Sequence, residues 1–440
     1  MVAPRLVPRL VRRRLLEALE DDPVVLVHGP RQSGKTTLVQ GVGDASDRTY
    51  VTFDDDVLRA SAEADPIGFV RSLPDRVTLD EVQRVPQIFT TLKATIDRDR
   101  APGRFLLTGS ANVFAVPRLA DSLAGRMTVL RLYPLAQVEL EATDPRFLDR
   151  LFAGAFAVGP FDRSSGASLA ERIVAGGFPP ALARPSERRR QRWYRDYVDA
   201  VTQRDVRDLA RITALDALPR LMEVVAGQTA RLINVSDLAA PFALARPTID
   251  GYLTLLRHVF LVDELPAWHR NRLKRLVKAA KLHIGDTGIG AAVLGVGSER
   301  LGADRHLYGQ LLETFVFQEL RRQASGRDDD VRFFHYRDRD GYEVDVVLER
   351  NGAEVAGIEV KGAATVTDGD FAGLRRLERA AGRDFKAGVV LYDGDACLPF
   401  GDRMYAVPIH ALWRDEPGGR SRGNPREGAH AGSTSSPRAG

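Results

Sequence analysis

The first part of the chain alternates short apolar runs with longer stretches of helical periodicity, from about residue 15 to residue 133. The apolar runs fall at 24–27, 77–79 and 105–107 and are rich in Val, Leu and Phe. Alternation of strands and helices in this way is typical of a parallel sheet covered by helices. We therefore expect an α/β domain with a parallel-sheet core over residues 1–140.

The pattern changes after this domain. Residues 154–168 are rich in Gly, Ser and Phe, and arginine-dense helical stretches follow over 188–208. A compact two-helix pattern covers 235–265, and mixed strand and helix patterns return over 309–413. We expect a helical lid or linker over 141–215, a two-helix module over 216–280, a second α/β domain over 281–413 and a disordered tail over 414–440.

The first apolar run leads into a glycine-rich segment that precedes a helical pattern. Its residues are Gly29, Pro30, Arg31, Gln32, Ser33, Gly34, Lys35, Thr36 and Thr37. In a G-x-x-x-x-G-K-T loop the backbone N–H groups point inward and the next helix directs its positive end to the same point, which favours phosphate. Lys35 is expected to reach the β- and γ-phosphates and Thr36 to bind Mg²⁺. These residues therefore predict a site for ATP and Mg²⁺ rather than an ordinary turn.

The second apolar run ends in two carboxylates, Asp80 and Glu81. Asp80 is placed to hold Mg²⁺ through water, and Glu81 to polarise the attacking water as the base of phosphoryl transfer. By itself such a pair is typical of a strand that leaves the core into a solvated turn. Together with the upstream loop it predicts the second half of an ATPase site.

The third apolar run ends close to Ser110 and Asn112. Either side chain could orient the water or sense the γ-phosphate. Ser110 could equally cap a following helix, so the sequence leaves both roles open.

These segments together resemble a family of prokaryotic AAA-type ATPases, in which a short ATPase module precedes a characteristic C-terminal region of unassigned function. The matching segments are Gly29–Thr37, Leu79–Gln83, Leu107–Ser110, Asp121–Arg126, Gly176–Pro179, Asp286–Gly288 and Ile358–Lys361. The resemblance extends to about Trp413. It implies ATP binding and hydrolysis by an AAA-like P-loop domain, and it names no biological process.

Arg126 follows the third predicted strand, where AAA-type proteins tend to place an arginine finger. The resemblance makes it a candidate for stabilising charge at the γ-phosphate. The alternative is a surface arginine that pairs with Asp121 or another neighbour. A finger that acts on a neighbouring subunit implies a homo-oligomer.

The module over 216–280 resembles a winged helix. Ser236 is expected to cap its first helix, and Arg246 with Pro247 to open the second. Asp250 and Gly251 occupy the face where basic residues would read bases, so sequence-specific DNA reading is not expected.

A basic run follows between Arg270 and Lys281, with six Lys or Arg residues. It could contact DNA phosphates without reading sequence. The alternatives are a solvated face, or an internal docking surface for the acidic ATPase loop at 54–56.

The last domain carries acidic residues in an order that resembles the PD-(D/E)xK nuclease core. Glu313 lies on an apolar helical segment, Asp345 on a strand, and Glu359 with Lys361 on the next strand. The resemblance implies that the two strand carboxylates hold Mg²⁺, that Glu313 completes the shell and that Lys361 orients or deprotonates a water. A cross-strand salt bridge is the other reading of the Glu-x-Lys pair. We expect a restriction-nuclease-like α/β fold, with or without cleavage.

Composition sets limits on these expectations. Among 440 residues, 44% are hydrophobic and a single cysteine is present, which excludes an intramolecular disulfide and a cysteine-based zinc site. The net charge of +4 is too small to argue for nucleic acid. The absence of a bilayer-length apolar run and of a signal-peptide pattern predicts a cytoplasmic protein without a membrane partner.

We expect an AAA-type ATPase in which ATP binding and hydrolysis switch C-terminal domains that bind nucleic acid or a partner protein. Two alternatives stay open. One is an ATP-regulated, metal-dependent DNA nuclease, and the other is an ATP-dependent binding switch that does not hydrolyse.

Overall fold

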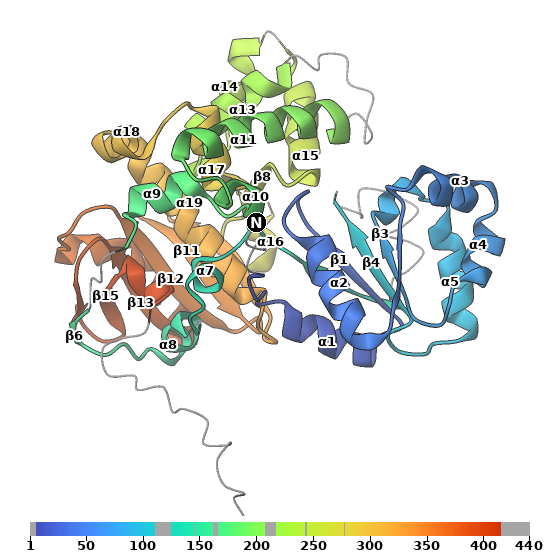
Figure 1. The fold of residues 1–440 in the computed structure, drawn as a ribbon. Helices are drawn as coiled ribbons and strands as arrows, with labels where there is room; N and C mark the ends of the chain where they lie inside the picture. Colours follow the sequence, from blue (N-terminus) through green and yellow to red (C-terminus); the bar gives the residue numbers. More distant parts are fainter. Residues whose placement is uncertain are drawn as a thin grey trace, which may run out of the picture.

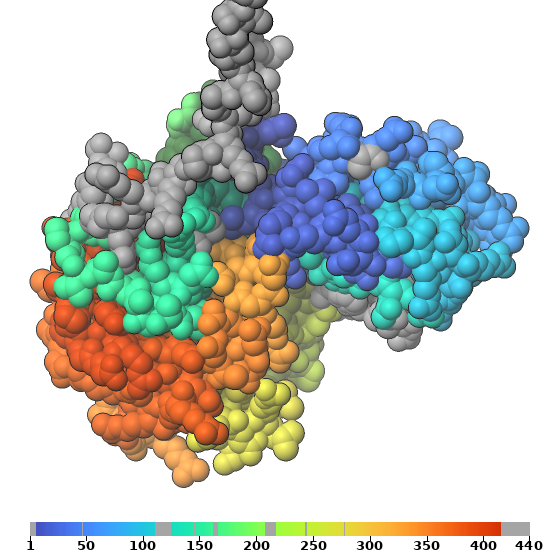
Figure 2. Space-filling model, turned by 90° about the horizontal axis from the view of Figure 1, so that it is seen from below, coloured from blue at the N-terminus to red at the C-terminus, as the bar shows by residue number. Residues whose placement is uncertain are grey.

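The computed structural model describes residues 6–110, 125–144, 146–161, 166–206, 217–242, 244–276 and 278–414. Asn112, residues 121–124 and the tail 415–440, for which predictions were made, lie outside the described residues. Figure 1 shows an α/β unit in blue and cyan that stands beside a larger body in green, yellow and orange. Figure 2 shows from below that the blue surface of this unit meets the orange surface of the body.

The first unit contains the predicted parallel sheet, which has five strands. Its strands are β1 (Val24–His28), β2 (Thr49–Thr52), β3 (Val77–Asp80), β4 (Phe105–Gly109) and β5 (Met127–Arg131), in the order β2-β3-β4-β1-β5. Every pairing in this sheet is parallel. Because β4 lies between β1 and β3 and all three run parallel, their carboxyl ends lie side by side at one edge of the sheet.

Helices cover both faces of this sheet. They are α1 (Arg12–Asp21), α2 (Lys35–Ser46), α3 (Asp56–Ala64), α4 (Pro66–Ser72), α5 (Ile88–Arg98) and the 3-10 helix η1 (Val82–Arg84). Val24 and Leu26 of β1 face one hydrophobic core, whereas Val25 and Val27 face the other. Burial on both faces explains why this strand is continuously apolar.

A middle unit is built around a second core and a three-stranded sheet. Its elements are α10 (Pro179–Leu182), α11 (Glu187–Ala200), the π-helical turn η3 (Val201–Asp205), α13 (Ala217–Gly227), β7 (Arg231–Leu232), α14 (Val235–Ala239), η4 (Ala240–Phe242), α15 (Arg246–His258), β8 (Val262–Leu265), α16 (Arg272–Arg275), β9 (Lys281–Ile284) and α17 (Thr287–Val293). The strands pair antiparallel in the order β7-β9-β8.

Two of the details predicted for this unit can be compared with the structure. The second helix, α15, begins at Arg246 with Pro247 in its first turn, as predicted. The predicted cap at Ser236 is wrong: Asn234 caps α14, and its side chain accepts a hydrogen bond from the backbone N–H of Ser236.

The C-terminal unit holds a seven-stranded mixed sheet. Its strands are β10 (Val331–Arg337), β11 (Glu343–Arg350), β12 (Glu354–Lys361), β13 (Phe385–Tyr392), β15 (Met404–Pro408), β14 (Ala396–Pro399) and β6 (Gly159–Pro160), given in their spatial order. Its helices are α7 (Gln137–Glu141), α8 (Phe147–Ala153), α9 (Leu169–Ala175), α18 (Ser298–Ala303), α19 (Arg305–Ala324), α20 (Ala372–Ala381), η5 (Asp368–Phe371), η6 (Gly382–Asp384) and η7 (Ile409–Leu412). Val346 packs with α19 on one face, and Val347 packs with α20 on the other.

The hydrophobic cores divide the chain differently from the predicted boundaries. Phe147 and Leu151, predicted for the lid, pack into the core of the C-terminal sheet, and β6 extends that sheet. Tyr194 and Val198, also predicted for the lid, belong to the core of the middle unit. Ile284, predicted for the last domain, also packs in the middle core, because β9 completes the three-stranded sheet.

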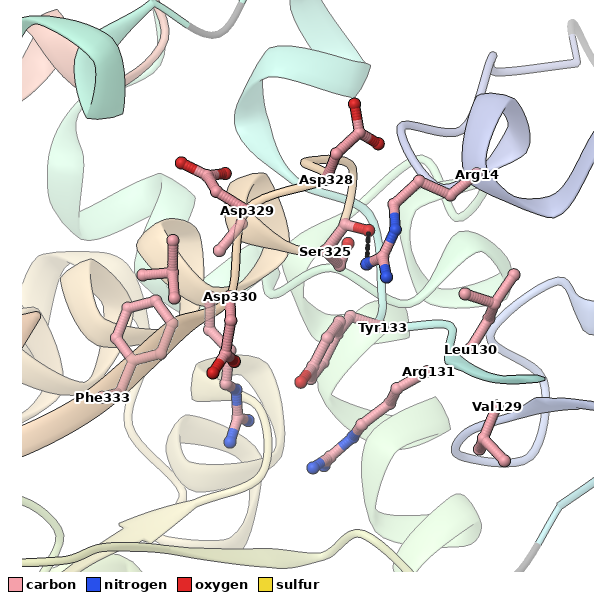
Figure 3. A pocket seen from close by; sticks show the side chains of 13 residues that line it. Arg14, Val129, Leu130, Arg131, Tyr133, Ser325, Asp328, Asp329, Asp330 and Phe333 are labelled. Carbon is pink, nitrogen blue, oxygen red and sulfur yellow. Dashed lines mark hydrogen bonds between the residues drawn. The ribbon is translucent and has the colours of Figure 1, made fainter. Parts of the chain in front are cut away.

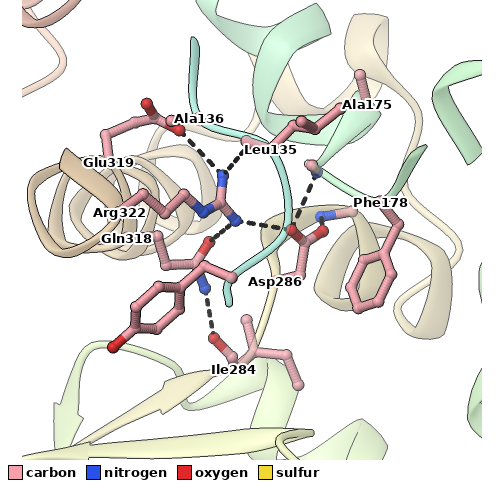
Figure 4. Close-up of polar contacts among 12 residues, drawn as sticks. Leu135, Ala136, Ala175, Phe178, Ile284, Asp286, Gln318, Glu319 and Arg322 are labelled. Carbon is pink, nitrogen blue, oxygen red and sulfur yellow. Dashed lines mark hydrogen bonds and ion pairs between the residues drawn. The ribbon is translucent and has the colours of Figure 1, made fainter. Parts of the chain in front are cut away.

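A buried polar network joins segments that lie far apart in the sequence (Figure 4). Arg322 on α19 donates to the Leu135 carbonyl at 3.0 Å, to Glu319 at 3.0 Å and to Asp286 at 2.9 Å. Asp286 also accepts a hydrogen bond from the backbone N–H of Gly177 at 3.0 Å. Two sequence motifs that carried the family resemblance, around Gly177 and Asp286, therefore meet at one structural node.

Candidate functional site

The predicted phosphate loop connects β1 to α2, which begins at Lys35. A Cβ on Gly29 would lie 2.1 Å from the carbonyl oxygen of Leu132, so only glycine permits this close approach. The carbonyl of Ser33 accepts a hydrogen bond from Arg9 at 2.8 Å. Gln32 and Thr37 are exposed at the surface of the loop and in the first turn of α2.

Lys35 is buried and its ammonium turns back into the loop. It donates hydrogen bonds to the carbonyl oxygens of Gly29 at 3.1 Å and of Pro30 at 3.0 Å. Burial lowers the pKa of Lys35, and the nearby carboxylates of Glu81 and Asp80 oppose that shift. A phosphate bound in the loop would supply a negatively charged partner for this buried ammonium.

Asp80, at the end of β3, is held by hydroxyl groups from three directions. Thr36 Oγ1 donates to Asp80 Oδ2 at 3.1 Å, and the Tyr50 hydroxyl donates to the same oxygen at 2.6 Å. Thr108 at the end of β4 donates to Asp80 Oδ1. The structure therefore brings together Thr36 and Asp80, the two residues predicted for Mg²⁺, and their oxygen atoms suit this ion. Sequence reasoning assigned no role to Tyr50 or Thr108; the signal for Thr108 was a polar residue near the carboxyl end of a neighbouring strand.

Glu81 has a left-handed backbone, with φ of 58°. Its N–H donates to Thr108 Oγ1 at 3.0 Å. Gln83 donates to the Glu81 carboxylate and, at 2.9 Å, to Ser110 Oγ. Burial raises the pKa of Glu81, but Lys35 and the hydrogen bonds with Gln83 and Ser110 outweigh it, so the pKa is lowered. Glu81 is therefore an oriented, ionised carboxylate, which is the state that a general base requires.

Arg31 connects the loop to the middle unit. Its guanidinium donates to Asp205 of η3 at 3.1 Å, and its carbonyl accepts from the Tyr197 hydroxyl at 3.3 Å. The phosphate loop is thus in direct contact with the end of α11.

Arg126 lies at the opposite edge of the sheet from the phosphate loop. Met127, which follows it, pairs with Val24 at the amino end of β1, whereas the loop follows the carboxyl end of β1. A strand of this length separates the two edges by roughly 13 Å. Arg126 instead pairs with Asp97 at 2.6 Å. The structure thus places Arg126 far from the loop of its own chain, and its role as a finger, which would have to act on a neighbouring subunit, stays a prediction.

A second constellation lies between the middle and C-terminal units. Lys281 of β9 donates to Glu313 at 2.7 Å and to Asp345 at 3.0 Å. Glu359 adjoins them: the charges of Asp345, Lys281 and Glu313 all act on it, and its buried Oε2 has no hydrogen-bond partner. The three predicted acids therefore come together, but the cation among them is Lys281. Lys361, predicted for this group, pairs with Asp370 instead.

The donor set does not fit a metal ion as it is arranged. In the described ranges, no group of three or more His, Cys, Asp or Glu is placed to hold one. Burial, and then Asp345, raise the pKa of Glu313 to about 8, whereas Lys281 opposes the shift. Burial and the charge of Asp345 likewise raise the pKa of Glu359 well above its usual range. Protonation and Lys281 therefore offset the charge of the cluster.

Part of the basic run between 270 and 281 docks against the C-terminal unit. Arg275 pairs with Glu349 at 2.6 Å and stacks over Phe334 at 4.7 Å. Lys278 and Lys281 also bond to the C-terminal unit, at Arg337 O and at the acidic cluster. The partner surface is the C-terminal unit and not the acidic loop at 54–56, where Asp54 pairs with Arg84.

The first unit also meets the body at Arg131, the last residue of β5. Arg131 donates to Asp263 of β8 at 3.0 Å, and Arg321 of α19 donates to the same carboxylate. Both guanidinium groups lie over the Tyr133 ring, at 4.7 and 4.9 Å. Figure 3 shows the adjoining cavity of about 390 Å³, where Arg14 of α1 also reaches in. One carboxylate is therefore shared by cations from the two flanking units.

Within the described residues, none of the helices is both long and apolar enough to cross a membrane.

Comparison with known proteins agrees with this arrangement. An AAA domain model matches residues 21–141, and domains of unknown function DUF8612 and DUF4143 match residues 166–300 and 308–412. The "Uncharacterized protein Rv2008c" of Mycobacterium tuberculosis is 30% identical over 404 residues, covering 91% of this chain and 83% of that protein. The "Uncharacterized protein MJ1544" of Methanocaldococcus jannaschii is 22% identical over 358 residues, covering 77% and 75%.

Among solved structures, the Walker-type ATPase PABY2304 of Pyrococcus abyssi is similar with a TM-score of 0.39 and 15% identity, covering 64% of this chain and 94% of that chain. The AAA domain implies binding of ATP with Mg²⁺ and suggests hydrolysis. The chain belongs to the protein family of Rv2008c, and in this chain an AAA domain precedes two domains of unknown function.

Proposed function

We propose that the chain binds Mg-ATP at the carboxyl edge of the parallel sheet and hydrolyses it. The observation that carries this proposal is the contact between Thr36 and Asp80, with Thr36 Oγ1 3.1 Å from Asp80 Oδ2 beside the buried Lys35. A hydroxyl and a carboxylate at one point suit Mg²⁺, and a lysine with inward loop N–H groups suits phosphate. Bound Mg²⁺ would offset negative charge on the phosphate oxygens.

The roles of the chain's own residues follow from their contacts. Lys35 binds the β- and γ-phosphates, and Glu81 accepts a proton from the attacking water. Gln83 holds the Glu81 carboxylate in place and links it to Ser110. Thr108 fixes Asp80 and Glu81 relative to each other, since it bonds to both.

We infer that the nucleotide state switches the middle and C-terminal units. The support is their contact with residues beside the loop: the ring of His28, which immediately precedes Gly29, lies 5.7 Å from the Phe260 ring of the middle unit. The element order α13-β7-α14-α15-β8-β9 favours a winged-helix-like binding module. The partner of this module would be a nucleic acid or another protein. Four cations of the basic run are exposed and offer a phosphate-contacting surface: Arg270, Arg272, Lys274 and Lys278.

A second candidate is metal-dependent cleavage of nucleic acid by the C-terminal unit. The observation in its favour is the gathering of Glu313, Asp345 and Glu359 on α19, β11 and β12. The Lys281 ammonium among these acids counts against it, so no cleavage step is derived. Nuclease assays with Mn²⁺ on wild type and Asp345→Ala test this candidate. Equal cleavage by both proteins, or no cleavage by either, would exclude metal-dependent cleavage at this cluster.

The test of the ATPase compares Glu81→Gln with wild type by ATP affinity and by phosphate release. Glu81→Gln should keep the affinity and lose turnover, because the amide preserves shape but cannot accept the proton. Lys35→Ala should lose affinity. The exposed Glu63→Gln is the matched control and should behave as wild type. Turnover at the wild-type rate in Glu81→Gln would exclude Glu81 as the base. ATP binding without any turnover by the wild-type chain would support a non-hydrolysing switch.

A further inference from the structure

An ion pair ties the Arg31 side chain to the middle unit. Its NH1 lies 3.1 Å from Oδ1 of Asp205, and both side chains are largely shielded, at 31% and 16% exposure. Asp205 ends the π-helical turn η3, which continues α11. π-helical turns within α-helices occur frequently at functional sites. The pair therefore joins the phosphate loop to an unusual helical segment.

Arg31 belongs to the phosphate loop itself, between Gly29 and Lys35. The charges of Arg31 and Asp205 both act on Lys35, and the charge of Arg31 also acts on Glu81. Lys35 is the expected partner of the β- and γ-phosphates, and Glu81 the expected base beside the terminal phosphate. Arg31 and Asp205 are thus within electrostatic range of the transferred group.

The surroundings give the guanidinium room to change partner. A cavity of about 300 Å³ adjoins it, lined by Arg31 and Gln32 of the loop, by Trp193 and Tyr197 of α11, and by further residues of α11 and η3. The Tyr197 hydroxyl holds the Arg31 carbonyl at 3.3 Å, so the backbone is fixed while the side chain can move. Trp193 stacks on Tyr197, with 5.2 Å between ring centroids, and so reports on this cavity.

We propose that the γ-phosphate of ATP and the carboxylate of Asp205 compete for the guanidinium of Arg31. Arginine binds phosphate and carboxylate oxygens by the same paired hydrogen bonds, so the two partners can exchange. With ATP bound, Arg31 contacts the γ-phosphate and its guanidinium leaves Asp205 of η3, while the Tyr197 hydroxyl keeps the loop backbone on α11. With ADP bound, the pair with Asp205 forms again. Arg31 thereby contacts the terminal phosphate of its own chain, from which Arg126 is separated by the length of the sheet. It also transmits the nucleotide state to α11.

This inference rests on the proposed function, and its test separates the two. Calorimetric affinities for ADP and a slowly hydrolysed ATP analogue are compared in wild type, Arg31→Ala and Asp205→Asn. Arg31→Ala should lose about tenfold to a hundredfold in affinity for the ATP analogue, with ADP nearly unchanged. Asp205→Asn should raise the preference for the ATP analogue, because the competing carboxylate charge is removed. Arg188→Ala, exposed on α11, is the matched control.

Fluorescence of Trp193 supplies an independent readout. The ATP analogue should change it in wild type and not in Arg31→Ala, and Trp193→Phe identifies the signal. The inference would be overturned if Arg31→Ala lost affinity equally for ADP and the ATP analogue, or if the ratio of the two affinities were unchanged in Arg31→Ala and Asp205→Asn. Either result would leave the proposed ATPase function intact. Failure of wild type to bind either nucleotide would overturn the proposed function and this inference with it.

Discussion

Lys281 donates a hydrogen bond to Asp345 at 3.0 Å, although the two residues belong to different sheets. Lys281 lies on β9 of the middle unit and Asp345 on β11 of the C-terminal unit. The same ammonium also bonds to Glu313 at 2.7 Å, and its side chain is only 4% exposed. A buried lysine from one unit thus offsets the acidic cluster of the other. This ion group joins the two units.

We predict that Lys281→Met destabilises the chain by about 3–5 kcal/mol, because it leaves the buried carboxylates without their cation. Urea unfolding measures the change. Lys278→Met is the matched control, since Lys278 is exposed and bonds only to a carbonyl at 3.1 Å. Its cost should stay below about 1 kcal/mol. Equal stability of the two variants would contradict the role given to Lys281.

The pH dependence of stability tests the same cluster. The pKa of Glu313 is raised from its ordinary value of 4.5 to about 8 by burial and by Asp345. Between these values the folded chain holds a proton that the unfolded chain has lost, so the free energy of unfolding falls as pH rises through this window. Glu313→Gln has no proton to lose there.

We therefore expect the melting temperature to fall less between about pH 5 and about pH 8.5 in Glu313→Gln than in wild type. Differential scanning calorimetry at several pH values measures the two slopes. The exposed Glu63→Gln serves as the control and should follow wild type. Parallel slopes in Glu313→Gln and wild type would show that the carboxyl is already ionised in the folded chain.

Local patterns predicted the nucleotide site because its parts lie within short segments. The loop from Gly29 to Thr37 and the strand end at Asp80 each carry their own signal, and the parallel sheet brings them to one edge. The Arg31–Asp205 and Lys281–Asp345 pairs were not predicted, since their partners lie 174 and 64 residues apart. Charge alone does not choose among the many acids of the chain.

Arg126 shows a different limit of sequence reasoning. Its position after a predicted strand suggested closeness to the site. Strand direction decides instead, because Arg126 precedes β5 and therefore lies at the amino edge of the sheet. Similarly, the predicted lid was divided between two cores, since apolar periodicity shows that a helix has a buried face but not which sheet that face covers.

Thr108→Val tests the link between Asp80 and Glu81. The buried hydroxyl of Thr108 donates to Asp80 and accepts from the N–H of Glu81 at 3.0 Å. Its removal should cost about 1–3 kcal/mol of stability and lower turnover more than ATP affinity. Thr78→Val on the adjacent strand is the matched control, because the buried Thr78 Oγ1 has no hydrogen-bond partner. It should be neutral or stabilising, and a similar loss of turnover in both variants would contradict the link.

Gly176→Ala tests the polar node that joins the family motifs. Gly176 has φ of 63°, and a Cβ there would lie 2.2 Å from Oδ1 of Asp286 and 2.3 Å from the hydroxyl of Tyr194. The added methyl group must displace the buried carboxylate that Arg322 holds at 2.9 Å. We expect a loss of about 2–4 kcal/mol from strain and from the weakened ion pair.

The matched control for this change is Gly251→Ala. Gly251 lies within α15, and nothing stands within 4 Å of its added Cβ. Alanine should stabilise this helix by about 0.5–1 kcal/mol, because glycine loses more backbone entropy on folding. Urea unfolding of both variants should therefore give changes of opposite sign. If Gly176→Ala left stability unchanged, the close contact between Gly176 and Asp286 would not be needed for the fold. The meeting of the two motifs would then require a functional explanation.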